Sequence, residues 1–80
     1  MEKRILNRIK AVLAEKGVKS KDLANKCSVK EATVSNWSTN KSQPSLETLF
    51  EIADYLEVDV RTLINSNFAQ KNIDPQEKIF

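Results

Sequence analysis

Residues 17–37, GVKSKDLANKCSVKEATVSNW, carry apolar side chains at the spacing of two helices. Leu23 and Cys27 are four residues apart, and Val34 and Trp37 are three residues apart. Steps of three and four residues bring side chains to one face of an α-helix. The stretch therefore predicts two short amphipathic helices in close succession.

Two helices so close together predict a helix-turn-helix unit. We expect the first helix at about 20–27 and the second at about 30–38, with the small residue Ser28 in the turn between them. In a helix-turn-helix, the second helix enters the major groove of DNA. A lone motif of this kind is weak evidence for DNA binding.

The sequence on both sides of the motif narrows the interpretation. Short segments follow one another in order: RIK at 8–10, EKG at 15–17, LA at 23–24, TVSxW at 33–37, QPSLETL at 43–49, IA at 52–53 and VDVRTLI at 58–64. On these segments, residues 7–64 resemble the phage-repressor and Cro type of helix-turn-helix, often called the XRE family. The resemblance implies an all-α, five-helix, lambda-repressor-like domain that binds double-stranded operator DNA, usually as a dimer. It implies no cofactor.

Length and composition bound the class of protein. Eighty residues predict one domain, which we place at 1–65, followed by a C-terminal tail at 66–80. With one Cys and no His, a disulfide framework within the chain is excluded, and neither a metal site nor an enzyme is expected. We expect Cys27 to be a buried apolar residue rather than a reactive thiol.

The N-terminal sequence and the hydropathy of the chain indicate its location. The first residues, MEKRILNRIKAVL, are too charged for a signal peptide. No apolar run approaches the roughly 20 residues that a membrane-spanning helix needs. We therefore expect a soluble, cytoplasmic protein without a membrane partner.

Charge is divided unevenly along the chain. Residues 1–41 contain ten basic and four acidic side chains, whereas residues 42–80 contain three basic and seven acidic ones. The basic half includes the helix-turn-helix. A basic surface beside a helix that reads DNA is typical of nucleic-acid binding, although charge alone would also fit a solvated surface.

Three further helices are predicted as scaffold. The first covers 3–16 and ends before Gly17, and Ser45 and Asp59 have side chains that cap the fourth and fifth helices. The apolar face of the first helix consists of Ile5, Leu6, Ile9, Val12 and Leu13. That of the fourth consists of Leu46, Leu49, Phe50, Ile52, Ala53 and Leu56. That of the fifth consists of Val60, Leu63 and Ile64.

The outer face of the helix at 30–38 is the predicted base-reading surface. Val34 and Trp37 share the apolar face and should point into the core. The resemblance places Glu31, Ala32 and Ser35 at the family's base-reading positions, with Lys30 and Asn36 at the edges. We therefore predict DNA base contacts from Lys30, Glu31, Ala32, Ser35 and Asn36. Glu31 either accepts from cytosine or pairs with Lys30.

Two segments are predicted to contact DNA phosphates. At the start of the helix at 20–27, Lys19 replaces the Ser or Thr that is usual in the family, so Ser20 caps this helix or its N-terminus faces a phosphate. The loop after the next helix is polar, and its Asn40 replaces the usual glycine because Asn tolerates the left-handed conformation. The predicted phosphate contacts are Lys19, Ser20, Lys21, Asn40, Lys41 and Ser42.

We expect a transcriptional regulator, a repressor that binds a two-fold operator as a homodimer. One alternative is the antitoxin of a toxin–antitoxin pair, and another is a protein-interaction module in which Glu31 has abolished DNA binding.

The tail contains Phe68, Ile73, Ile79 and Phe80 without helical spacing, and Pro75 interrupts it. It is either a disordered segment or an arm that packs on the domain or on a dimer mate.

Overall fold

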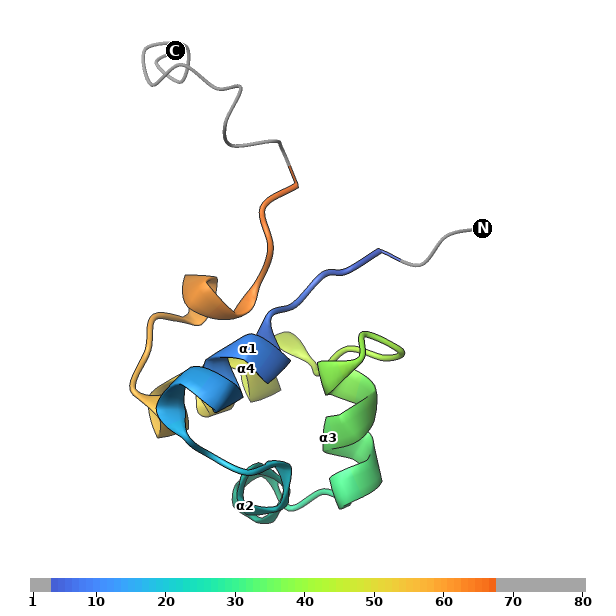
Figure 1. Cartoon of the computed structure of the whole chain (residues 1–80), viewed down its shortest axis with the longest axis vertical. Helices are drawn as coiled ribbons and strands as arrows, with labels where there is room; N and C mark the ends of the chain where they lie inside the picture. The colour runs from blue at the N-terminus through green and yellow to red at the C-terminus, as the bar shows by residue number, and fades with distance from the viewer. Residues whose placement is uncertain (1–3, 68–80) are drawn as a thin grey trace, which may run out of the picture.

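The protein folds into four α-helices and one short 3-10 helix, seen here in a computed structural model that describes residues 4–67 (Figure 1). The elements are α1 (Ile9–Lys16), α2 (Ser20–Cys27), α3 (Glu31–Ser38), α4 (Leu46–Leu56) and η1 (Val60–Leu63). In these residues the only β pairing is an isolated antiparallel bridge between Asn7 and Ile64. The all-α class and the bounds of the two central helices agree with the sequence-based expectation.

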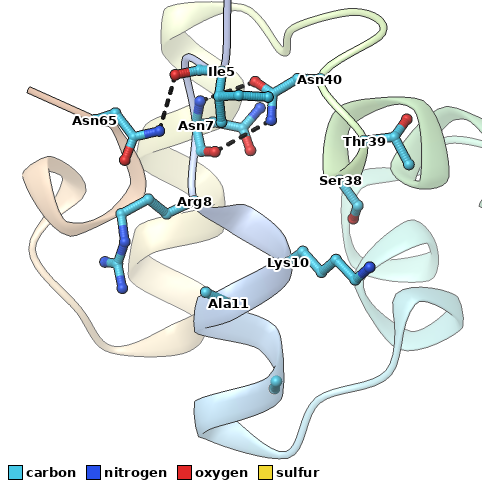
Figure 2. A pocket seen from close by; sticks show the side chains of 10 residues that line it. Ile5, Asn7, Arg8, Lys10, Ala11, Ser38, Thr39, Asn40 and Asn65 are labelled. Atoms are coloured by element: carbon cyan, nitrogen blue, oxygen red, sulfur yellow. Dashed lines mark hydrogen bonds between the residues drawn. The ribbon is translucent and has the colours of Figure 1, made fainter. Parts of the chain in front are cut away.

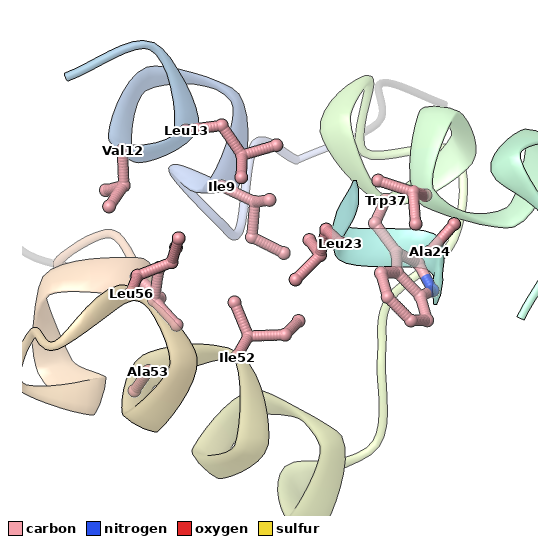
Figure 3. Close-up of a cluster of buried hydrophobic side chains, with 11 residues drawn as sticks. Ile9, Val12, Leu13, Leu23, Ala24, Trp37, Ile52, Ala53 and Leu56 are labelled. Atoms are coloured by element: carbon pink, nitrogen blue, oxygen red, sulfur yellow. The ribbon is translucent and has the colours of Figure 1, made fainter. Parts of the chain in front are cut away.

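A single hydrophobic core joins all five elements. Each element contributes at least one fully buried aliphatic side chain, and these are Ile9, Val12, Leu23, Val34, Ile52 and Leu63. Trp37 lies beside them with 6% of its surface exposed (Figure 3). The core position predicted for Val34 and Trp37 is therefore confirmed, and it fixes which side of α3 faces outward.

All four α-helices end in the same left-handed turn. The residue after the helix or its cap has φ between 58 and 69° at Gly17, Ser28, Asn40 and Glu57. In each case the next residue donates its N–H to the carbonyl five positions back, as Lys41 does to Asn36 at 2.9 Å. This is the Schellman arrangement, which satisfies carbonyls that the helix leaves open. Because the chain has one glycine, three of these turns hold an L side chain in a strained conformation.

The first helix is shorter than predicted. Lys3 lies outside the described residues, residues 4–8 are not helical, and α1 begins at Ile9. Ile5 is 62% exposed and Leu6 is 43% exposed, so neither belongs to the core. The segment pairs with residues 63–65 instead: Arg8 donates its N–H to Leu63 and Asn65 donates its N–H to Leu6, at 2.8 and 2.9 Å.

The predicted fifth helix is a 3-10 turn of four residues. Asp59 caps it as expected, because its Oδ1 accepts the backbone N–H of Arg61 at 2.8 Å. The Arg61 side chain and backbone hold the pKa of Asp59 down to about 2, so this cap persists until the pH falls well below 4. Ile64 then adopts an extended conformation to pair with Asn7, and this pairing prevents a longer helix.

The apolar face of α4 is also narrower than predicted. Ile52, Ala53 and Leu56 are buried, but Leu46 is 70% exposed and Phe50 is 50% exposed. Leu49 packs half-buried against the core, and the outer side of the helix stays exposed because so small a domain has few elements to cover it. The predicted cap is confirmed, since Ser45 Oγ accepts the N–H of Thr48 at 3.1 Å.

Glu57→Gly should stabilise the domain by roughly 0.5–1 kcal/mol. Glycine removes the left-handed strain at φ 59°, although it also increases the entropy of the unfolded chain. Glu51→Gly is the matched control, since it removes the same exposed side chain within α4 and should destabilise by about 1 kcal/mol. Denaturant unfolding of the two variants measures both changes. Equal loss of stability in both would show that the turn after α4 is not strained.

Candidate nucleic-acid interface

The turn between α2 and α3 sets the orientation of the second helix. Ser28 adopts a left-handed conformation with φ 58°, and Val29 donates its N–H to the Ala24 carbonyl at 3.0 Å. Val29 is half-buried against the core, so the turn is held by packing as well as by hydrogen bonds. The chain then enters α3 through Lys30, which is extended with ψ 152°.

The five predicted base-reading residues lie together on the outer side of α3. The backbone of this helix is anchored from within by Val34 and Trp37, both buried. Lys30 precedes the first turn, and the remaining residues follow at helical spacing on the exposed side. All five are exposed: Lys30, Glu31, Ala32, Ser35 and Asn36.

Glu31 is exposed and forms no ion pair within the described residues. Among residues 4–67 the ion pairs are Arg8 with Glu15 and Arg61 with Asp59, and neither includes Glu31 or Lys30. Glu31 is the first residue of α3, where the positive end of the helix dipole favours a carboxylate. The pairing of Glu31 with Lys30 that the sequence allowed is therefore not formed.

The N-termini of α2 and α3 differ from those of α4 and η1. Ser45 and Asp59 cap α4 and η1 with their side chains, but Lys19 and Lys30 begin α2 and α3 without a side-chain cap. Ser20 is the first residue of α2 and does not act as its cap. Uncapped N–H groups beside a lysine form a site suited to an anion such as a phosphate.

The predicted phosphate contacts in the loop after α3 differ in exposure. Lys41 and Ser42 are exposed, and their N–H groups both donate to the Asn36 carbonyl, at 2.9 and 3.3 Å. Asn40 has the predicted left-handed conformation, with φ 63°, but only 5% of its surface is exposed. Its side-chain amide is held inside the protein and is poorly placed to meet a phosphate.

Asn7 is a residue of this region that the sequence analysis missed. Its Oδ1 accepts the N–H of Ile9 at 3.0 Å, and its Nδ2 donates to the Trp37 carbonyl at 3.0 Å. One buried side chain thus satisfies the start of α1 and the end of α3. Asn is a preferred residue at helix N-termini, which was the available signal, but the spacing of Ile5 and Ile9 favoured a continuous helix.

A groove of about 660 Å³ runs between α1 and the end of α3 (Figure 2). Its lining includes Arg8, Lys10 and Thr39 and contains no carboxylate or thiol. Arg8 donates from Nη1 to the Thr62 carbonyl at 2.8 Å, so its charge is fixed at the rim. Ser38 and Thr39 contribute hydroxyl groups to its walls, but among the described residues no carboxylate or imidazole that could activate them as nucleophiles lines the groove.

Three further features of the described residues bear on function: the thiol, the potential metal ligands, and the length and hydropathy of the helices. Cys27 packs half-buried against the core, and burial, together with the charge of Glu51, raises the pKa of its thiol. Residues 4–67 hold no cluster of three His, Cys, Asp or Glu side chains suited to a metal ion. Across the same residues, no helix has the length and apolar content to cross a membrane.

Comparison with known protein families places the chain in one of them. A family model described as the Cro/C1-type HTH DNA-binding domain matches residues 8–68. Antitoxin HipB of Escherichia coli O6:H1 is 35% identical over 72 residues, which are 90% of this chain and 71% of HipB.

Solved structures agree with this assignment. A crystal structure from Bacteroides fragilis, provisionally described as a DNA-binding protein, is 53% identical with a TM-score of 0.74, over 75% of this chain and 97% of that chain. The N-terminal DNA-binding domain of SinR from Bacillus subtilis is 32% identical with a TM-score of 0.62, over 78% of this chain and 91% of that domain. The chain belongs to the Cro/C1-type (XRE) helix-turn-helix family, whose members are DNA-binding domains and not enzymes.

Proposed function

We propose that this protein is a sequence-specific transcriptional regulator, a repressor, that reads the major groove with α3. The observation that supports this most directly is the division of α3 into two sides. Val34 and Trp37 are buried, whereas the predicted base-reading residues are all exposed and none is needed to fill the core. Exposed polar side chains on a rigidly packed helix are suited to reading base edges.

The chemistry of these side chains suits a mixed site rather than a guanine-rich one. Asn36 can hydrogen-bond adenine through its amide, and Ala32 can contact a thymine methyl group. Glu31 can accept from the cytosine amino group, and its charge would reject bases that present acceptors. The outer face contains no Arg, the residue that most often reads guanine.

Phosphate contacts are proposed from two segments, one before and one after α3 in the sequence. The first is the uncapped start of α2, with Lys19, Ser20 and Lys21. The second is the loop with Lys41 and Ser42, which we retain from the predicted set without the buried Asn40 side chain. Such contacts would fix the position of α3 on the duplex and supply affinity without sequence preference.

We further propose that the protein binds a two-fold operator as a homodimer. Ile5, Leu6 and Ile64 are exposed, and the bridge between Asn7 and Ile64 brings these residues together. An apolar surface of this kind favours association. In a two-fold dimer, the half-site centres should lie about 34 Å apart, or a multiple of that distance. The tail residues that we considered for this contact, Phe68 to Phe80, lie outside the described residues.

A second candidate function is an antitoxin that also binds DNA. It is favoured by the 35% identity to antitoxin HipB over 90% of this chain. The third possibility, an interaction module without DNA binding, predicts a different result in the same experiment. Selection of bound sequences from random duplex DNA at low salt should enrich a two-fold motif if the proposal is right. Failure to enrich any motif would contradict it and favour the interaction module.

Glu31→Gln should separate base reading from attachment. Loss of the carboxylate reduces repulsion from phosphates, so binding to random DNA should hold or improve. Loss of an acceptor suited to cytosine should reduce discrimination at one base pair by about 1–3 kcal/mol. Glu47→Gln is the matched control, because it removes an exposed Glu from the first turn of α4. Titrations with the selected operator and its single-base variants measure both effects, and an unchanged preference at every position would remove Glu31 from the reading surface.

Lys41→Ala should weaken binding to operator and random DNA alike. If the Lys41 ammonium neutralises one phosphate, the slope of log affinity against log salt should decrease in magnitude by about one. Lys26→Ala removes the same charge from the last turn of α2 at a residue outside the proposed set of phosphate contacts, and it should leave the slope unchanged. Equal slopes for Lys41→Ala and wild type would show that this loop does not meet the backbone.

A further inference from the structure

The loop after α3 is tied to the segment that precedes α1 through the side chain of Asn40. Asn40 Oδ1 accepts the backbone N–H groups of Leu6 and Asn7 at 2.8 and 3.0 Å. Asn40 Nδ2 donates back to the Asn7 carbonyl at 3.3 Å (Figure 2). The amide thus pairs with the extended backbone at Asn7 much as a neighbouring strand would.

Asn7 completes the tie in the opposite direction. Its Nδ2 donates to the Trp37 carbonyl at 3.0 Å and to Gln43 Oε1 at 2.7 Å. Gln43 Nε2 in turn donates to Asn40 Oδ1 at 3.1 Å. Asn7, Asn40 and Gln43 therefore form a closed network, which we call the amide cluster. It joins the end of α3, the following loop and the start of α1.

This network exceeds what the turn itself requires. A glycine at position 40 would adopt φ 63° without strain, and the backbone bonds from Asn40 to Trp37 and from Lys41 to Asn36 need no side chain. Ser28 and Glu57 occupy equivalent turns, and both are exposed. Among the three strained turns, only the one at the C-terminal end of α3 has its side chain buried in a tertiary network.

We propose that Asn40 and Asn7 are positioning residues for DNA binding. The amide cluster holds the loop with Lys41 and Ser42 at a fixed place beside the C-terminal end of α3. The loop donors and the base-reading side chains then approach the duplex as one rigid unit, so less ordering is needed on binding. This role rests on the proposed function, because it assumes that the loop contacts phosphates.

Asn40→Gly tests this role with little risk to the fold. It keeps the left-handed turn and its backbone hydrogen bonds but removes every bond of the amide cluster that involves position 40. Ser28→Gly is the matched control, because it makes the same change in the equivalent turn after α2. All measurements are made at a temperature at which circular dichroism shows each variant fully folded.

The first measurement is hydrogen exchange of the free protein. In Asn40→Gly, the amides of Lys41 and Ser42, which donate to the Asn36 carbonyl, should exchange faster than in wild type by about tenfold or more. Those of Val29 and Leu23 should not change. In Ser28→Gly, the Lys41 and Ser42 amides should keep the wild-type rate. Unchanged exchange in Asn40→Gly would overturn the positioning role without any reference to DNA.

The second measurement is DNA affinity in a double-mutant cycle with Lys41→Ala. A charge-assisted contact corresponds to about tenfold in affinity, so Asn40→Gly should lose about that factor on operator and random DNA. The slope of its log affinity against log salt should decrease in magnitude by about one, as in Lys41→Ala. Its base preference should not change. In the Lys41→Ala background, Asn40→Gly should reduce DNA affinity by at most about twofold. The contact that Asn40 positions, from the Lys41 ammonium to a phosphate, is already absent there.

The outcomes separate this role from the proposed function. Wild-type affinity in Asn40→Gly, or a loss that simply multiplies with that of Lys41→Ala, would overturn the positioning role while DNA binding stands. A wild-type protein that binds no duplex at low salt would overturn the proposed function, and this role with it.

Discussion

Burial of the inner side of α3 is the constraint on which the rest of the domain depends. Val34 and Trp37 pack into the same core as Ile9, Leu23 and Ile52, so α3 cannot rotate about its axis without exposing the indole. A helix with one fixed side has its other side fixed as well. The packing that stabilises this small fold therefore also determines which side chains face a ligand, and a substitution in the core would alter binding without touching DNA.

The N-termini of α4 and η1 are capped by side chains, whereas those of α2 and α3 are not. Side-chain caps at Ser45 and Asp59 satisfy the first N–H groups of α4 and η1, and these two elements lie in the acidic half of the chain. The N-termini of α2 and α3 begin at lysines and have no such caps. An uncapped helix costs some stability in the free protein. A bound phosphate can restore that stability, so the missing caps are consistent with a surface that is completed by its ligand.

The sequence predicted the elements that local side-chain chemistry determines. It failed where the structure depends on pairing between segments that are distant in the sequence. Apolar spacing and side-chain type determine α2, α3 and the Ser45 cap, and all three were predicted. The start of α1 was wrong because Ile5 repeats the helical spacing of Ile9, whereas Asn7 and Ile64 pair across most of the chain length. Leu46 and Phe50 were assigned to the core by the same spacing, which does not reveal how many neighbours are available to cover a helix. The base and phosphate contacts remain predictions.

The residues at the left-handed turns differ in whether their side chains form tertiary hydrogen bonds. Gly17 ends α1 without strain, and Ser28 and Glu57 accept the strain with exposed side chains. Asn40 accepts it too, but its buried amide takes part in four hydrogen bonds that reach the segment before α1 and Gln43. A buried amide with fewer partners would be costly, so Asn40 is tolerable only together with that segment. Asn40 and the residues at 6–7 therefore have to be understood as one structural unit, although more than thirty positions separate them in the sequence.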